Sequence, residues 1–338
     1  MKANADLPLV TIQMSTYNQE KYVRESVRGV LAQTYEPLQI VISDDHSTDS
    51  TWEIVQEEVD AYRQSGGVHK DIVLNRNSEN LGIMRHFQFI ATLCKGEIWV
   101  CNAGDDISMP NRVERIVDAW RGTKNQVSCV LSGLTLIDES GQVVGTDEKL
   151  GISEDSPLGA VAAYDRRVVD CFPGIRHREA YEDVVFVRRA LILGEVVKIP
   201  DRLVQYRNVG VCSGWVKSGF RVFRERASYC DREGLLQVLE DLEYKKSALT
   251  EERYESLKER FSKTEKCLRA EYEMITAPAL WLRLARSKTF AECFLGRFNP
   301  LTLGYLKAVL PRVLSKRSFD ALMFPFRTVR SMVRLFCG

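Results

Sequence analysis

Two adjacent acids, Asp105 and Asp106, stand in the stretch VCNAGDDISMPNRVERI (100–116), between an apolar run and a helix-like segment. Like charges repel, so two carboxylates at the end of a buried strand need compensation. A divalent cation supplies it, because Mg²⁺ and Mn²⁺ take oxygen ligands and often use one or two carboxylates together with phosphates. The alternative is a solvated turn in which one acid helps to cap the helix that begins near Pro110.

The apolar pattern around these acids alternates between strands and helices. Near-continuous apolar runs predict buried strands at 9–15, 38–43, 71–75, 97–102 and 127–138. Helix-like stretches lie between them at 19–33, 50–63, 83–94 and from Pro110 onward. A hairpin turn at 138–142, a helix at 180–194 and strands at 195–200 and 202–207 follow. The order predicts an α/β fold, with a mostly parallel central sheet and helices on both faces.

Polar clusters follow three of the predicted strands. They are STYN (15–18), DDHSTD (44–49) and GDD (104–106). In open α/β sheets ligands bind beyond the carboxyl ends of the strands. We therefore expect the three clusters to meet at one edge of the sheet. The alternative for the first two acids of DDHSTD is an Asx-type turn.

Three long stretches resemble the family 2 glycosyltransferases, which are inverting, nucleotide-sugar-dependent enzymes with the A-type glycosyltransferase fold. The similar stretches are 14–55, 79–120 and 181–207, and the resemblance covers roughly residues 8–215. It rests on the order and spacing of the motifs. It implies a catalytic domain over residues 1–218, followed by a helical, basic extension over residues 219–338.

The resemblance implies a nucleotide site at the first two clusters. Ser15, Tyr17 and Asp45, with Asp44 adjacent, would cradle the base. An acid that accepts from the imide N–H of uracil or thymine suits a UDP- or dTDP-sugar donor. Arg85 would approach the nucleotide, although an ordinary exposed helical arginine is the alternative, and Tyr17 could equally be a packing aromatic.

The same resemblance places a metal motif at the GDD cluster. Asp106 would ligate Mg²⁺ or Mn²⁺, and Asp105 would hold the ribose or share the metal. Many relatives carry a further acid two residues before this pair, where this chain has Ala103. The cation is thus held by fewer protein oxygens.

The resemblance also implies a catalytic base and a phosphate contact. Asp183, in YEDVVF, matches the base, with Glu182 as its neighbour, and the alternative is a pair of acids at a helix N-terminus. Arg207 matches an arginine that closes over the pyrophosphate, with a surface residue at the end of a strand as the alternative. The position of the usual following histidine holds Val209. His177 precedes the acid pair and is read as an exposed loop residue.

Charge is distributed unevenly along the chain. The net charge is +1, but residues 281–338 carry eleven Lys/Arg against two acids, which leaves residues 1–280 at −8. This basic tail, rich in Leu, Phe, Met and Val, predicts contact with an anionic membrane surface. The alternative is packing onto the catalytic domain or formation of a homodimer. No nucleic-acid motif is recognisable.

Cysteine usage and hydropathy indicate the compartment. The nine cysteines form no CxxC pair, and the four histidines show no metal-ligand spacing, as expected of free thiols in a reducing cytoplasm. There is no apolar signal core in MKANADLPLV and no run of about 18 apolar residues. The sequence predicts a cytoplasmic protein, peripheral at the inner face of the cell membrane.

Together these features predict a metal-dependent, inverting glycosyltransferase. It would move a sugar from the donor to a hydroxyl of a growing cell-surface glycan, such as a lipid-linked one, by single displacement with Asp183 as base. A sugar nucleotidyltransferase is the enzyme alternative, but STYNQEK lacks the glycine-rich loop that would hold a triphosphate. A catalytically inactive relative that acts as a scaffold is the alternative from another class, suggested by Ala103 and Val209.

Overall fold

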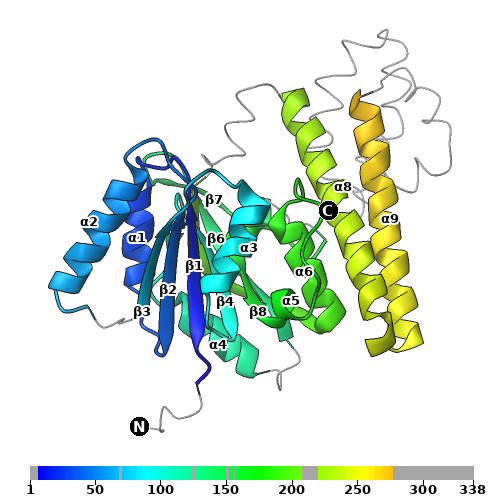
Figure 1. Cartoon of the computed structure of the whole chain (residues 1–338), viewed down its shortest axis with the longest axis horizontal. Coiled ribbons are helices and arrows are strands. Elements are labelled where there is room, and N and C mark those ends of the chain that lie inside the picture. Colours follow the sequence, from blue (N-terminus) through cyan, green and yellow to red (C-terminus); the bar gives the residue numbers. More distant parts are fainter. Residues whose placement is uncertain are drawn as a thin grey trace, which may run out of the picture. The chain divides into compact units, whose positions relative to one another are not determined.

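The computed structural model describes residues 7–67, 71–122, 127–149, 152–155, 157–207 and 220–276. Within these residues a nine-stranded sheet has the order β3-β2-β1-β4-β8-β6-β9-β5, with β7 beside β6 (Figure 1). The strands are β1 Val10–Thr16, β2 Leu38–Asp44, β3 Asp71–Arg76, β4 Ile98–Ala103, β5 Ile107–Ser108, β6 Val127–Ile137, β7 Val143–Thr146, β8 Ala162–Asp165 and β9 Glu195–Arg207.

The helices alternate with the strands in the first half of the chain and then follow them. They are α1 Val23–Leu31, α2 Thr51–Gln64, α3 Ile83–Leu93, α4 Arg112–Arg121, α5 Arg167–Asp170, α6 Glu182–Leu193, α8 Phe220–Lys245 and α9 Glu251–Thr276. Short 3₁₀ turns are η1 Asp147–Lys149, η2 Gly159–Val161 and η3 Lys246–Ala248. The predicted α/β fold with a helical extension is confirmed.

The sheet is mixed, so it is less parallel than expected. β3, β2, β1 and β4 are parallel neighbours, and β6 is parallel to β9. The short strand β8 runs antiparallel between β4 and β6, and β5 and β7 are also antiparallel to their partners. The first four strands are parallel because helices α1, α2 and α3 carry the chain back between them. β8, whose sequence AAYD has no distinctive pattern, breaks this arrangement.

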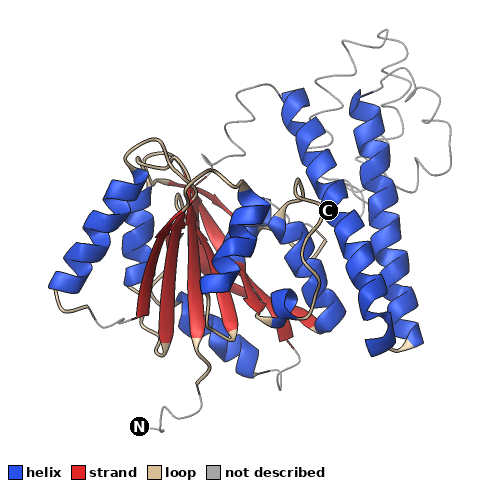
Figure 2. Cartoon of the chain, viewed as in Figure 1, coloured by secondary structure: helices blue, strands red, loops and turns tan. Residues whose placement is uncertain are grey.

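Helices cover both faces of the sheet (Figure 2). On one face, α1, α2 and α4 pack on side chains such as Ile12, Ile40 and Val100. On the other, α3, α5 and α6 pack on side chains that include Val41 and Trp99. Ile40 and Val41 point to opposite faces because side chains alternate along a strand. Both faces are therefore apolar, which explains the near-continuous apolar runs in the sequence.

The structure differs from the sequence-based prediction in the limits of one strand and one helix. The strands expected at 195–200 and 202–207 are one strand, β9, whose register against β6 shifts around Gly133. Pro200 lacks an N–H and cannot donate to the ladder, so the pairing skips this point. Helix α1 begins at Val23, later than expected, because Asn18 and Gln19 donate their backbone N–H groups to Ser47, in the loop after β2, and to Thr51, the first residue of α2.

The described part of the predicted helical extension is a hairpin of α8 and α9, joined by η3. By internal contacts, residues 1–217 and 229–265 form one compact unit, which contains the sheet and most of this hairpin. Residues 218–228 and 266–338 are assigned to a second unit, of which the structure describes only helical residues up to 276. The functional boundary at residue 218 stays a prediction.

The basic tail expected to meet a membrane lies outside the described residues, which end at Thr276. Among the helices that are described, none combines the length and the apolar character needed to cross a bilayer.

The hairpin is fastened to α6 by a buried ion pair. Arg189 donates from Nε to Oδ2 of Asp241 at 2.7 Å and from Nη2 to Oδ1 at 3.1 Å. The two side chains are 2% and 0% exposed. Gln237 also donates to Asp241, and the Arg189 guanidinium donates to the carbonyl oxygens of Val168 and Pro173.

Removing one partner should leave the other charge buried and uncompensated. We expect Asp241→Ala to lower the free energy of unfolding by about 3–5 kcal/mol, measured by urea denaturation followed by circular dichroism. Glu240→Ala is the matched control on the same helix, because its side chain is 48% exposed and it should cost less than about 1 kcal/mol. Equal costs for the two variants would contradict this account.

Candidate active site

The carboxyl ends of β1, β2 and β4 lie side by side, as the polar clusters predicted. Ser15 pairs with Ser43 on one side and with Ala103 on the other. β3 adds Arg76 next to Asp44. Three clusters that are far apart in the sequence therefore meet at one edge of the sheet, where this topology places ligands.

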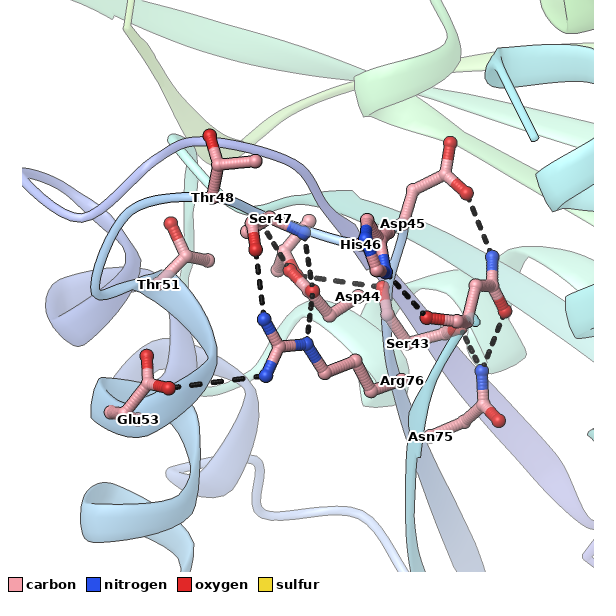
Figure 3. A network of polar contacts seen from close by, with 12 residues as sticks. Ser43, Asp44, Asp45, His46, Ser47, Thr48, Thr51, Glu53, Asn75 and Arg76 are labelled. Atoms are coloured by element: carbon pink, nitrogen blue, oxygen red, sulfur yellow. Dashed lines mark hydrogen bonds and ion pairs between the residues drawn. The ribbon is translucent and has the colours of Figure 1, made fainter. Parts of the chain in front are cut away.

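Asp44 is buried and shapes the loop after β2. Its Oδ1 accepts a hydrogen bond from Oγ1 of Thr16 at 3.0 Å, and its Oδ2 accepts one from the Ser47 N–H at 2.8 Å. Arg76 places Nε 3.7 Å from Oδ2 of Asp44 and donates to the Ser47 carbonyl at 2.8 Å (Figure 3). The carboxylate thus accepts from the backbone N–H three residues on, one residue further than in an Asx turn. A direct contact between Asp44 and a nucleotide stays a prediction.

Asp45 is 4% exposed and gathers donors from the loop before α3. Its Oδ1 accepts from Nδ2 of Asn77 at 2.7 Å and from the Leu81 N–H at 2.9 Å, and its Oδ2 accepts from the Gly82 N–H at 2.9 Å. Gly82 has φ +76°, which favours glycine there. A carboxylate offers about four acceptor positions, so one position remains on Oδ2 of Asp45.

A buried network of hydrogen-bonded polar side chains connects His86 to Asp45. Nε2 of His86 lies 2.8 Å from Oγ of Ser43, which accepts from Nδ2 of Asn75 at 2.9 Å. Asn75 also donates to Oδ1 of Asn77, which donates to Asp45 (Figure 3). Burial lowers the pKa of His86, although the charges of the two nearby acids oppose this. The imidazole is therefore neutral at pH 7 and orients Ser43.

The remaining residues predicted for the nucleotide are more accessible. Ser15 is half-buried at the end of β1, Tyr17 is 40% exposed after it, and Arg85 is exposed in the first turn of α3. Gly82, the N-cap of α3, donates its N–H to Asp45, so Arg85 lies in the first turn of a helix whose N-terminus contacts that carboxylate. Contacts of these three residues with a nucleotide stay predictions.

The acid pair lies in a tight turn between β4 and β5. A Cβ at position 104 would lie 2.2 Å from Oε1 of Gln19 and 2.8 Å from Cγ2 of Thr16, so any larger residue would require these side chains to move. Asp105 is 6% exposed and accepts a hydrogen bond from the Gln19 side chain. Asp106 is 1% exposed, and its Oδ1 accepts from the Arg207 N–H at 2.9 Å. Its Oδ2 is buried and has no hydrogen-bond partner in the described part of the chain.

Burial raises the pKa of Asp105 and raises that of Asp106 well above its usual value. The charge of Asp105 raises the pKa of Asp106 further, against the N–H of Arg207 and the charges of Arg112 and Arg207. A buried carboxylate oxygen without a partner is costly. The chemistry of the pair suits a divalent cation, and the roles of Asp106 as ligand and of Asp105 as ribose contact or second ligand stay predictions.

The protein offers this cation few ligands. No group of three or more His, Cys, Asp or Glu side chains that could hold a metal occurs among residues the structure describes. Position 103, two residues before the pair, holds alanine and adds no carboxylate. The remaining ligands would be phosphate oxygens and water, as is usual for Mg²⁺ at phosphate sites.

Arg207 contacts the turn that carries Asp105 and Asp106, which we call the acid turn. Its side chain is 2% exposed. Nε donates to the Asp105 carbonyl at 3.2 Å, Nη1 donates to the carbonyls of Asp138 and Glu139, and Nη2 donates to Oε2 of Glu25 at 2.6 Å. In this arrangement each guanidinium nitrogen already has a protein acceptor. A contact with the pyrophosphate stays a prediction, and Val209 with the rest of 208–219 lies outside the described residues.

The candidate base stands in the first turn of α6. Asp183 accepts from the Gly159 N–H through Oδ2 at 3.2 Å and from the Val184 N–H through Oδ1 at 2.7 Å. Burial raises its pKa well above the usual value, and the charges of Glu182 and Asp231 raise it further. Burial also raises the pKa of Glu182. A carboxylate of this kind accepts a proton more readily near neutral pH.

The prediction that His177 is exposed was wrong. It lies in a loop, but its side chain is only 19% exposed, and Nδ1 lies 2.8 Å from Oε2 of Glu233 on α8. No local pattern predicts this pairing, because the two residues are 56 positions apart.

Several residues of the site were missed in the sequence. They are Gln19, Asn77, His86, Asn102 and Arg112. Gln19 and Asn77 stand in polar clusters after strands, so their positions could have indicated them. His86 and Arg112 lie on helices, where only the three-dimensional structure shows that they point inward.

The chain was compared with known protein families and curated proteins. The model of the family described as Glycosyl transferase family 2 matches residues 11–141. A glucosyl-dolichyl phosphate glucuronosyltransferase of Haloferax volcanii is 33% identical over 232 residues, which cover 59% of this chain and 70% of that protein. An uncharacterized glycosyltransferase of Haemophilus influenzae is 29% identical over 152 residues. The matched region spans 45% of the length of this last relative.

Solved structures share the fold. The crystal structure of Staphylococcus aureus TarS 1–349 in complex with UDP-GlcNAc superimposes with a TM-score of 0.56 at 14% identity, over 88% of this chain and 91% of that one. The mannosyltransferase PcManGT of Pyrobaculum calidifontis, in complex with GDP-Man and Mn²⁺, gives 0.55 at 16% identity, over 94% and 84%. At these identities the likeness shows the fold, and the expected A-type fold is confirmed.

The raised pKa of Asp183 predicts a pH-dependent stability. A carboxyl whose pKa is raised in the folded state destabilises the fold progressively as the pH rises from its unfolded pKa, about 3.9, towards the folded value. We expect Asp183→Asn to raise the melting temperature of the metal-free protein more at pH 8 than at pH 5.

Melting curves in EDTA across this pH range measure the effect. Asp118→Asn is the control, because that side chain is 61% exposed and should change little. If the melting temperature of the wild type rose relative to that of Asp183→Asn between pH 5 and pH 8, this would contradict a raised pKa of Asp183.

Proposed function

The chain belongs to glycosyl transferase family 2, and from this premise we propose that it transfers a sugar from a nucleoside diphosphate to an acceptor hydroxyl. The observation that carries the proposal is the buried, unpartnered Oδ2 of Asp106 at the sheet edge where β1, β2 and β4 end. This atom is placed to ligate a cation that also binds the phosphates of a donor.

The donor we propose is a UDP- or dTDP-sugar. Asp45 has one acceptor position left beyond its three hydrogen bonds to Asn77, Leu81 and Gly82. The imide of uracil or thymine presents a single N–H donor. Guanine presents an N–H and an adjacent amino group, which together call for two acceptor positions. The geometry of Asp45 therefore favours the pyrimidine bases.

Mg²⁺ or Mn²⁺, held by Asp106 and Asp105, would act as a Lewis acid that neutralises charge on the departing nucleoside diphosphate. Asp183 takes the proton from the attacking hydroxyl, and its raised pKa suits that role at neutral pH. A single displacement with one base inverts the configuration at the anomeric carbon, so no second carboxylate is required as nucleophile.

The acceptor we propose is a growing cell-surface glycan linked to a lipid. The Haloferax volcanii relative is named for glucosyl-dolichyl phosphate, which is a lipid-linked sugar. The basic, apolar tail over residues 281–338 would hold the enzyme at an anionic membrane surface beside such an acceptor.

Thermal melting with nucleotides tests the donor site. Ligands that bind only the folded state raise its stability by about 2.7 kcal/mol at a hundred times Kd. We expect UDP or dTDP with Mn²⁺ to raise the melting temperature more than GDP with Mn²⁺. The part of the shift that depends on Mn²⁺ should disappear in Asp106→Ala and persist in Asp118→Ala.

Asp183→Asn separates binding from chemistry in the same preparation. The variant should keep the nucleotide shift and lose sugar transfer by about 10²- to 10⁴-fold. A folded wild-type protein whose melting temperature does not respond to any nucleotide would contradict the transferase and support the inactive scaffold.

A further inference from the structure

Arg112 is a fully buried cation at the start of α4. Its side chain is 0% exposed, although a first-turn arginine of a surface helix is normally solvated. Nε has no hydrogen-bond partner among described atoms, and burial lowers the pKa of the guanidinium to about 10. Burying a charge in this way is unfavourable unless its contacts compensate.

One side of the guanidinium holds the ends of the acid turn. Nη1 donates to Oγ of Ser108 at 2.8 Å and to Oδ1 of Asn102 at 3.3 Å. Ser108 also donates to Asn102 at 2.8 Å. Asn102 lies just before the turn that carries Asp105 and Asp106, and Ser108 lies just after it. Arg112 therefore holds together β4 and β5, the two strands that this turn connects.

The other side of the guanidinium contacts η2, the turn that lies against Glu182 and Asp183 at the start of α6. Nη2 donates to the Ala160 carbonyl in η2 at 2.8 Å. The preceding residue, Gly159, donates its N–H to Oδ2 of Asp183 at 3.2 Å. A Cβ on Gly159 would lie 2.6 Å from Oε1 of Glu182, so η2 lies directly against both acids.

We propose that Arg112 is a positioning residue that fixes the Asp105–Asp106 turn and the Glu182–Asp183 pair relative to each other. The roles of these acids as metal ligands and base rest on the proposed function. The planar fork of arginine suits the task, because two of its nitrogens reach acceptors on separate elements at once. A lysine presents one ammonium and cannot span both.

Hydrogen exchange tests the positioning role of Arg112 without any ligand. In Arg112→Met and Arg112→Lys, amides of residues 103–107 and of 157–161 should both exchange at least about tenfold faster than in the wild type, because the two segments lose a shared anchor. Arg121→Met is the control, since this arginine is exposed in the last turn of the same helix.

The exchange pattern decides between positioning and general destabilisation. Faster exchange in both segments, with β1 and β2 unchanged, supports the proposal. Unchanged exchange in either segment, or a uniform increase across the sheet, overturns it. If Arg112→Met does not fold, Arg112→Lys keeps the charge and gives the same comparison. Because no nucleotide is present, this result is independent of whether the protein is a transferase.

A kinetic cycle adds a readout that a purely structural role would not affect. Arg112→Lys should lower kcat for sugar transfer by at least about tenfold while changing KM for the donor less than about threefold. In an Asp183→Asn background the same substitution should lower kcat by a smaller factor than in the wild type, because one of the two acid pairs that Arg112 positions is already inactive. Additive losses in the double variant would overturn the proposal. A wild-type protein that binds no nucleotide would instead contradict the proposed function.

Discussion

A buried carboxylate oxygen without a partner is the constraint on which the site depends. Oδ1 of Asp106 is held by the backbone of Arg207, whereas Oδ2 has no partner in the described structure. Such an atom persists only where the surrounding structure holds it firmly and a ligand compensates it. The glycine at 104, the Gln19 amide and the buried guanidinium of Arg207 all hold this turn in place.

The two halves of the sheet make different contributions to this arrangement. The parallel strands β1, β2 and β4 bring their carboxyl ends together and so form the donor side. The part of the sheet with antiparallel strands returns other elements to the same place. β9 ends at Arg207 against the acid turn, and η2, which precedes β8, supports Asp183 through Gly159.

Local patterns in the sequence were sufficient for the parallel half of the fold. Strand β2 was expected at 38–43 and spans Leu38–Asp44, and the polar clusters meet as predicted, because apolar runs and turn residues act over a few positions. Residues whose roles depend on distant partners could not be predicted in this way. No local pattern indicated the contacts that Arg112, Arg207 and His177 make. Their partners lie 48, 102 and 56 positions away. β8 was missed because four residues carry too little pattern.

The most direct test of the account is the position of the cation. Crystals grown with UDP and Mn²⁺ would give an anomalous difference map at the manganese absorption edge. The account predicts one peak within bonding distance of Oδ2 of Asp106, shared with phosphate oxygens of the nucleotide. A peak elsewhere, or bound UDP with no manganese beside Asp106, would contradict it.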